Sequence, residues 1–367
     1  MNKTRIMTLG EVCATISDTY RSPAHEVTLI NTSDVLEGKV LNHERVPNKE
    51  LKGQFKKTFK KNDILYSEIR PQNKRFAFVD FDPVDYIAST KLMVLRADTS
   101  KVLPMYLYYH LKSAPVIAEL QMLAETRSGT FPQITFTELS NLTIPIPGIS
   151  EQEAIVATLK CIEDKIDCNT KINDNLQQQA QAIYASMFID NADPAWEQGH
   201  LSDLIAVKYG KDHKKLADGS YPVYGSGGIM RHVERPLYDK ESVLIPRKGT
   251  LNNVMYVNQP FWSVDTMFYT EMRLPNVAKF VYHVVKAKDL ASMNAGSAVP
   301  SMTTDILNAI EVAIPSASAL EEFEALVSPM YKAMQENDNQ SEILAKLRDA
   351  LLPKLMSGEI DVSDIQL

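Results

Sequence analysis

The chain has 367 residues, of which 44% are hydrophobic, so its length suggests two or three domains of an ordinary globular protein. Its formal net charge of −7 gives no overall sign of nucleic-acid binding. Three cysteines, Cys13, Cys161 and Cys168, are too few for a disulfide framework and indicate a reducing compartment. Since the polar segment 1–15 and the lack of a long apolar run argue against a secretory signal and a membrane span, we expect a cytoplasmic protein.

Charge is unevenly distributed along the chain. Residues 49–75 contain nine Lys or Arg against three acidic residues, a local charge of +6. Residues 151–190 contain three Lys against seven acidic residues, a local charge of −4. This contrast predicts different partners for a basic folded part and an acidic helix.

The first residues contain a short motif that returns in the second half of the chain. Leu9-Gly10-Glu11-Val12 is similar to Leu201-Ser202-Asp203-Leu204, which comes 192 residues later. Matching strands and one helix are expected after each motif. The expected strands are 63–70, 75–79, 92–95, 241–247, 254–257 and 267–270, and the expected helices are 105–112 and 277–286.

The stretch 128–188 recurs without a gap at 296–356, 168 residues later. Each copy runs from a Pro-x-x-Thr segment through an apolar strand to a proline, Pro147 or Pro315, and then into a long helical pattern. Because the repeated unit is a whole domain plus a helix, it indicates a duplication rather than a solenoid. The molecule should therefore have two similar halves.

Apolar residues in both long helical patterns alternate in spacings of four and three, which is a heptad seam. The residues that we expect to pair the helices are Ile155, Leu159, Ile162, Ile166, Asn169, Leu176, Ile183, Met330, Met334, Asn337, Leu344, Leu351 and Leu355. A helix of about 38 residues, the length of each pattern, extends roughly 57 Å, which is more than one small domain covers. We therefore expect an antiparallel coiled coil with pseudo-twofold symmetry. The alternative is two unrelated core helices, each buried in its own domain.

Both long helices have plausible start signals. Ser150 is expected as the N-cap of the first, with Glu153 completing a capping box, and Ser318 with Glu321 repeats the arrangement. In the seam, Asn169 and Asn337 occupy matching positions of the repeat, and a polar residue there can fix the register of the helix pair.

The glycine-rich segment 218–228 is the most distinctive loop. It lacks both GxxxxGK[ST] and GxGxxG, which argues against nucleotide binding. Two compatible interpretations remain, a cluster of β-turns and a close backbone approach to DNA phosphate.

Basic and amide side chains gather in matching places of the two halves. Arg70 and Arg247 each end an apolar strand before a polar, turn-prone segment, and arginine reads guanine while Asn and Gln read adenine. Phe55 and Phe59 interleave with lysines, so one side can pack while the other faces an anion, although a solvated face is the usual role of such a charge run. The DNA-binding candidates are Lys56, Lys57, Lys60, Arg70, Gln72, Asn73, Lys74, Arg75, Lys208, Lys211, Lys214, Lys215, Ser226, Arg247, Lys248, Thr250, Asn252 and Asn253.

Catalytic and metal-binding patterns are missing from the sequence. The histidines are scattered without HExxH or HxH, and no methyltransferase motif of the Asn-Pro-Pro-Tyr type is present. Tyr109-His110 and Tyr282-His283 lie on amphipathic patterns, so we interpret these histidines as satisfied core or boundary residues. Cys161 and Cys168 are expected to face a core.

Several motifs together resemble the DNA specificity subunit of Type I restriction-modification systems. The motifs are 218–228, Ser242 to Gly249, Phe261 to Thr266, Pro132-Gln133-Ile134 leading to Pro147, Ser150 to Glu153, and Leu347 to Gly358. The chain departs from the usual pattern at Ala319-Leu320-Glu321, where the family generally keeps a Glu-Gln pair.

The resemblance implies an α+β fold with two target-recognition domains, each reading part of a split, asymmetric DNA sequence. These domains are expected at 1–149 and 191–317, with spacer helices at 150–190 and 318–367, the latter including the C-terminal tail, and specificity is expected in 23–127 and 205–295. The family's specificity subunit has no catalysis and binds no cofactor. It docks two methyltransferase subunits that use S-adenosylmethionine and modify adenine, and through them restriction subunits that use ATP and Mg. The alternatives are a coiled-coil DNA-binding or scaffold protein and an independent DNA-modifying enzyme.

Overall fold

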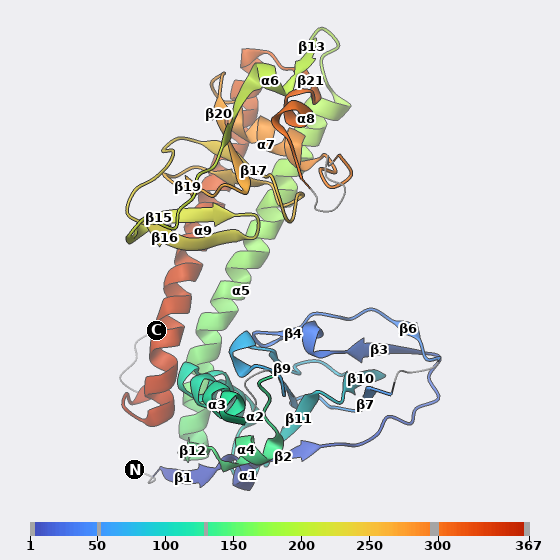
Figure 1. The fold of residues 1–367 in the computed structure, drawn as a ribbon, viewed down its shortest axis with the longest axis vertical. Coiled ribbons are helices and arrows are strands. Elements are labelled where there is room, and N and C mark those ends of the chain that lie inside the picture. The colour runs from blue at the N-terminus through green and yellow to red at the C-terminus, as the bar shows by residue number, and fades with distance from the viewer. Residues whose placement is uncertain (1–3, 50–52, 128–130, 294–300, 363–367) are drawn as a thin grey trace. The chain divides into compact units, whose positions relative to one another are not determined.

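The computed structural model describes residues 4–49, 53–127, 131–293 and 301–362 (Figure 1). Ser128, Gly296, Pro300 and Lys52, which belong to the predicted repeat and basic segment, lie outside these ranges. The chain forms two compact units, here called unit 1, Met1–Cys168 with Asn339–Leu367, and unit 2, Asn169–Asp338.

Unit 1 contains two four-stranded sheets and two short strand pairs. The first sheet has the order β2 (Cys13–Ile16), β11 (Leu92–Ala97), β8 (Ile64–Ser67), β9 (Phe76–Phe78), and all its neighbours are antiparallel. The second has the order β6 (Val46–Pro47), β3 (Glu26–Ile30), β10 (Tyr86–Ser89), β7 (Phe55–Lys57), with β3 and β10 parallel. The strand pairs are β1 (Arg5–Thr8) with β12 (Thr143–Ile146) and β4 (Val35–Leu36) with β5 (Lys39–Val40). The helices are α1 (Leu9–Val12), α2 (Pro104–Lys112), α3 (Ala114–Arg127), α4 (Phe136–Asn141) and the start of α5 (Ile149–Ala185).

Unit 2 repeats the first of these sheets and replaces the second. Its four-stranded sheet has the order β14 (Ile205–Tyr209), β20 (Met267–Met272), β17 (Ser242–Pro246), β18 (Met255–Val257). A three-stranded sheet has the order β16 (Gly228–Val233), β15 (Asp218–Gly225), β19 (Trp262–Ser263), with β15 and β19 parallel. The pair β13 (Glu197–His200) with β21 (Glu311–Ile314) matches β1 with β12. The helices are α6 (Leu201–Leu204), α7 (Ala278–Lys286), α8 (Thr304–Asn308) and the start of α9 (Ala317–Ser357), and a π-helical turn, Ser186–Asp190, follows α5.

Each unit has a large core that includes both long helices. In unit 1 the early turns of α5 and the late turns of α9 contribute Leu159 and Leu355 to the cluster that contains Leu9, Leu95 and Tyr109. In unit 2 the late turns of α5 and the early turns of α9 supply the corresponding residues, among them Tyr184 and Phe323. Burial of these side chains in a shared core is the main force that joins each sheet to the helices.

The two long helices pair antiparallel within each unit (Figure 1). In unit 2, Asn173 Nδ2 donates to Asp338 Oδ1 at 2.7 Å, Asn169 Nδ2 donates to Asn337 O at 3.3 Å, and Asn337 Nδ2 donates to Asn173 Oδ1 at 2.8 Å. In unit 1, Arg348 lies 3.8 Å from Glu163. The predicted mixed α+β halves with long, antiparallel helices are confirmed, and the predicted polar break at Asn169 and Asn337 is a hydrogen-bonded contact.

The seam differs from the prediction near the helix ends. Ile155 and Leu159 are buried in the core of unit 1, among residues of its sheet and of α2, and Phe323 and Val327 are buried similarly in unit 2. The end turns therefore pack against a domain as well as against the partner helix. Seam residues away from the ends, such as Leu176 and Leu344, are half-buried.

The predicted helix starts are wrong by one or two residues. Helix α5 begins at Ile149, where the amides of Glu151 and Gln152 donate to Gly148 O at 3.0 Å, so Ser150 lies inside the helix. Gln152 holds this start by donating from Nε2 to Pro147 O at 3.0 Å. Helix α9 begins at Ala317, and Ser316 rather than Ser318 accepts a hydrogen bond from the amide of Ala319 at 3.3 Å.

Two further predictions are corrected. Cys161 and Cys168 are exposed on α5 rather than facing a core, whereas Cys13 is buried. The strand expected over 63–70 ends at Ser67, because the chain turns toward the repeat segment, where Ile69 forms a bridge with Gln133.

Candidate nucleic-acid interface

The glycine-rich segment of unit 2 is a β-hairpin rather than a loop. Strands β15 and β16 pair antiparallel up to Gly225 and Gly228, with Ser226 and Gly227 at the turn. Gly228 has φ of +110°, a backbone conformation that L side chains rarely adopt, so glycine is required there. The sequence pattern indicated the turn but not the strands on either side of it.

The polar loop after β17 packs against the tip of this hairpin. Asn253 Nδ2 donates to Ser226 O at 2.8 Å. A Cβ at Gly249, whose φ is +86°, would lie 2.7 Å from Ser226 Oγ, so only glycine allows this close approach. The structure thus joins two segments that were predicted separately, 218–228 and 247–253.

Arg247 connects this loop to a third segment. Its Nη1 donates to Asp265 O at 3.1 Å, and its Cζ lies 5.4 Å from the centre of the Tyr209 ring at the end of β14. Tyr209 introduces the basic segment in which Lys211, Lys214 and Lys215 are exposed. The three candidate segments of unit 2 therefore form one surface.

The corresponding loop of unit 1 follows β8 and forms a single 3-10 turn, Pro71–Asn73. Arg70 and Lys74 flank it with left-handed backbones, with φ of +43° and +51°. The amide of Arg70 donates to Pro132 O at 3.1 Å, and Gln121 Oε1 of α3 accepts from the amide of Gln72 at 3.2 Å. These contacts fix the loop while the side chains of Arg70, Gln72 and Asn73 remain exposed.

Hydrogen bonds to the repeat segment show how the two loops correspond. The amide of Ile134 donates to Glu68 O, and the amide of Met302, which lies 168 residues after Ile134, donates to Arg247 O, both at 2.9 Å. Arg247 thus matches Glu68 in position, and Gly249 matches Arg70. The left-handed bend is common to both loops. Arg247, however, comes two residues before the position in unit 2 that matches Arg70.

Some predicted DNA-binding side chains are already engaged within the protein. Lys57 Nζ donates to Thr90 O at 3.0 Å and Leu92 O at 2.8 Å, and burial lowers its pKa. Arg75 Nη1 donates to Ser33 O at 3.0 Å. Asn252 Nδ2 donates to Asp289 Oδ1 at 3.1 Å, and Asn253 holds the hairpin as described. These contacts give the four side chains structural roles.

Two predicted lysines form surface ion pairs, and the alternation expected around Phe59 is present only in part. Lys74 lies 2.9 Å from Glu37, and Lys208 lies 3.5 Å from Glu271. Phe59 is buried and Lys60 is exposed, whereas Thr58 is half-buried. The predicted residues with exposed side chains are Lys56, Lys60, Arg70, Gln72, Asn73, Lys74, Lys208, Lys211, Lys214, Lys215, Lys248, Thr250 and Asn252, and Ser226 and Arg247 are half-exposed.

The buried histidines are structural, as predicted. His110 Nε2 lies 3.1 Å from Thr143 O, and His283 bonds to Gln181 Oε1 at 2.8 Å and to the Tyr331 hydroxyl at 2.9 Å. Burial lowers the pKa of each histidine to about 4. In the described part of the chain, no group of three or more His, Cys, Asp or Glu is placed to hold a metal ion.

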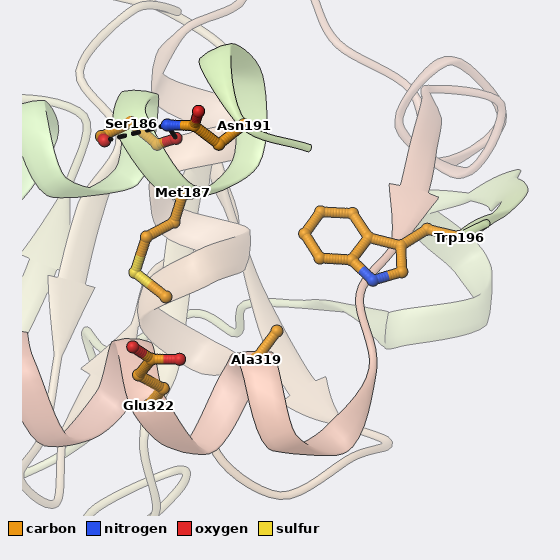
Figure 2. Close-up of a pocket in the computed structure, with 6 residues that line it drawn as sticks. All are labelled: Ser186, Met187, Asn191, Trp196, Ala319 and Glu322. Carbon is orange, nitrogen blue, oxygen red and sulfur yellow. Dashed lines mark hydrogen bonds between the residues drawn. The ribbon is translucent and has the colours of Figure 1, made fainter. Parts of the chain in front are cut away.

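A surface pocket of about 260 Å³ lies in unit 2 beside the end of α5 (Figure 2). Figure 2 shows Met187 and Glu322 on facing helices, with Trp196 at one side, and Asn191 Nδ2 donates to Ser186 O at 2.9 Å. Glu322 is the titratable residue among those lining it, so the pocket lacks the acid and base pair that proton transfer requires. Within the described ranges, none of the helices has the length and apolar composition needed to cross a membrane.

Comparison with known proteins gives one family and several relatives. The family described as Type I restriction modification DNA specificity domain matches residues 1–178 and 194–351. The Type I restriction enzyme HindI specificity subunit of Haemophilus influenzae is 28% identical over 96% of this chain and 98% of that protein. The MjaIX specificity subunit of Methanocaldococcus jannaschii is 23% identical over 77% of each. The crystal structure of the S subunit from M. genitalium shares the fold, with a TM-score of 0.60 and 19% identity over 97% of this chain and 96% of that one.

Proposed function

Because the chain belongs to the Type I restriction modification DNA specificity domain family, we propose that it reads one bipartite, asymmetric DNA sequence. As a specificity subunit of a Type I restriction-modification system, it recognises DNA and is not itself an enzyme. Each unit would read one half of the site, because each carries its own exposed loop of basic and amide side chains.

The observation that carries the proposal is the pair of loops after β8 and β17. Both follow matching strands, both bend through a left-handed residue, and both are hydrogen-bonded to the repeat segment, at Pro132 and at Met302. Their surroundings differ, since α3 supports one loop and the β15–β16 hairpin supports the other. Loops held alike but surrounded differently support recognition of two different half-sites.

We also propose that the two helices separate the half-sites and dock two methyltransferase subunits, with restriction subunits joining through them. The acidic stretch 151–190, with its local charge of −4, supports a surface for protein rather than DNA. The methyltransferase subunits would bring S-adenosylmethionine for adenine methylation, and the restriction subunits ATP and Mg. The complex would act on DNA in the cytoplasm, where the free thiols of Cys161 and Cys168 remain reduced.

The test is to express the chain with the methyltransferase subunits of its own system and to map methylated adenines across the host genome. We expect methylation at one bipartite motif, and none when this chain is omitted. Random or absent methylation with all subunits present would contradict the proposal.

Two further results separate the alternatives. Methylation by the purified chain alone would indicate an independent enzyme. DNA binding by the assembled complex should weaken steeply as salt rises, because phosphate contacts release counterions. A complex without salt-sensitive DNA binding would instead indicate a protein-binding scaffold.

A further inference from the structure

Two aromatic side chains stand out by their exposure. Of the Phe, Tyr and Trp residues in the described ranges, Phe131 at 51% and Tyr209 at 53% are the ones that are exposed. Single exposed apolar residues are common on protein surfaces and need no explanation by themselves. Here one ring lies in each unit, and both occur beside an arginine of the candidate interface.

The geometry of the two pairs is alike. The Cζ atom of Arg70 lies 6.0 Å from the centre of the Phe131 ring, and that of Arg247 lies 5.4 Å from the centre of the Tyr209 ring. Both distances fall within the range of a cation–π contact, which extends to about 6 Å. Each ring thus restrains a long side chain that otherwise has many rotamers.

Duplication does not explain the resemblance, because neither partner is at a matching position. The residue that matches Tyr209 in the first half is Ser17, and the residue that matches Phe131 in the second half is Val299. The arginines themselves are displaced by two residues, as the hydrogen bonds of Glu68 and Arg247 show. The two units therefore reach the same arrangement from different residues, which points to a shared requirement at the surface rather than to shared ancestry.

We propose that Phe131 and Tyr209 are positioning residues that hold Arg70 and Arg247 ready to contact a base edge, an inference that rests on the proposed function. Bidentate contact with guanine requires the flat guanidinium group to be oriented within the groove. A ring against one face of that group fixes its plane and leaves the N–H groups at its edge available. The rings thus contribute to specificity through the arginines.

The two pairs are not restrained equally. Arg247 has a second restraint, because its Nη1 also donates to Asp265 O at 3.1 Å. Arg70 is the residue with the left-handed backbone, and its backbone is fixed at Pro132, next to Phe131. Loss of the ring should therefore matter more for Arg70 than for Arg247.

The experiment uses the complex assembled with its methyltransferase subunits and a pool of duplex DNA with randomised sequence. The bound fraction is sequenced, and affinity is then measured on the selected duplex. Phe131→Ala should weaken binding about fivefold and relax base preference in one half of the motif only, as expected for a cation–π contact at a partly exposed site. Tyr209→Ala should have the same kind of effect, of smaller size, in the other half.

Matched variants separate positioning from direct contact. Phe131→Tyr and Tyr209→Phe keep a ring and should retain the full motif. Val84→Ala in unit 1 and Leu274→Ala in unit 2 remove other exposed apolar side chains and should change nothing. The double variant Arg70→Ala with Phe131→Ala should bind no more weakly than Arg70→Ala alone, because the ring acts through the arginine.

The inference is overturned if the alanine variants select the unchanged motif with unchanged affinity, if both halves of the motif weaken equally, or if the double variant shows additive loss. Failure of the proposed function gives a different result, since the unaltered complex would then select no motif at all. Thermal unfolding of each variant verifies that the exposed substitutions leave the fold intact.

Discussion

The two units keep one sheet in common and differ in the other, and in each unit the common sheet lies between two cores. The shared sheet, β2-β11-β8-β9 in unit 1 and β14-β20-β17-β18 in unit 2, contributes side chains of one face to the cluster that contains the long helices and side chains of the other face to a second cluster. The second sheet lies over a separate, smaller cluster around Ile30 and Ala88 in unit 1 and around Val223 and Phe261 in unit 2. A domain built on two cores can change its second sheet while keeping its attachment to the helices.

The two units differ in length in the part of the chain that builds their differing sheets. Matching residues are 192 apart at the first strand of the shared sheet, Cys13 and Ile205, but 179 apart at the next, Ile64 and Val243. Unit 1 therefore has 13 additional residues, 192 less 179, between these strands, where β3 to β7 form. This length difference falls within 23–127, the part of unit 1 in which the sequence predicts specificity.

In both units a short helix, α2 or α7, binds α5 at its Tyr-His pair, but the polar contacts that hold it differ. In unit 1 the Tyr109 hydroxyl donates to Glu163 at 2.8 Å, whereas in unit 2 His283 binds Gln181 and Tyr331. Lys279 adds a buried ion pair with Glu324 at 2.6 Å and another with Glu241 at 3.1 Å. The same docking of a helix against α5 is therefore stabilised by different polar contacts.

Removal of a central aromatic residue should separate the stabilities of the two units. Phe323 is fully buried in the core of unit 2, so Phe323→Ala should lower the free energy of unfolding of that unit by about 3–5 kcal/mol. Both tryptophans, Trp196 and Trp262, lie in unit 2, so urea unfolding followed by their fluorescence reports this unit. Hydrogen exchange in β8 and β11 should stay unchanged, and equal acceleration there would show that the units unfold together.

Acid should weaken both units over the same range. The pKa of His110 and of His283 is lowered to about 4 by burial, while an unfolded histidine has a pKa of about 6.5. The unfolded state therefore binds the proton first, and stability is lost as pH falls from about 6.5 to about 4, by up to about 3 kcal/mol per histidine. His283→Gln should reduce this slope in tryptophan-detected unfolding, whereas His110→Gln should not. An unchanged slope in His283→Gln would assign the acid sensitivity to other groups.

The ion pairs of Lys279 in unit 2 and of Lys112 in unit 1 should differ in importance. Lys279→Met leaves Glu241 and Glu324 without their shared cation, so we expect a loss of about 3 kcal/mol in unit 2. Lys112 forms an ion pair with Glu163 in unit 1, and Lys112→Met should cost that unit only about 1 kcal/mol, because Glu163 keeps Arg348 at 3.8 Å. Urea midpoints from tryptophan fluorescence and from exchange in β11 measure the two losses, and equal values would contradict the comparison.

The smallest expected effect concerns the helix starts. Ser316→Ala removes the side chain that accepts from the amide of Ala319 and should cost about 1 kcal/mol. Ser150→Ala lies within α5 and should change stability by only a few tenths of a kcal/mol. If Ser150→Ala cost as much as Ser316→Ala, the sequence-based capping prediction would be the better one.

The sequence was informative where the signal is local and periodic. The strands at Ile64 and Ser242, the helices that contain His110 and His283 and the long heptad helices all follow from the spacing of apolar residues. The repeat also indicated the polar contact of Asn169 with Asn337. The strand and helix patterns alternate within a few residues, and the repeat is found by comparing the sequence with itself 168 residues later.

The features that were missed depend on distant parts of the chain. Exposure of Cys161 depends on which face of α5 is covered by other elements, and spacing along one helix does not specify that. The start of α5 at Ile149 depends partly on Gln152, which accepts from the amide of Leu103 at 2.9 Å. Phe131 and Tyr209 had no local signal, because each matters only through an arginine elsewhere in the sequence.

The order in which the chain is made has a consequence for its two cores. Unit 2 is one continuous stretch, whereas Leu352, Leu355 and Met356 belong to the core that Leu9 begins. The ribosome needs roughly 10 to 35 seconds to add residues 169–338 at about 5–20 residues per second. During that time the core of unit 1 lacks the side chains that α9 contributes to it. A stop codon early in the second half of α9 would therefore damage the domain made first and spare the one made last.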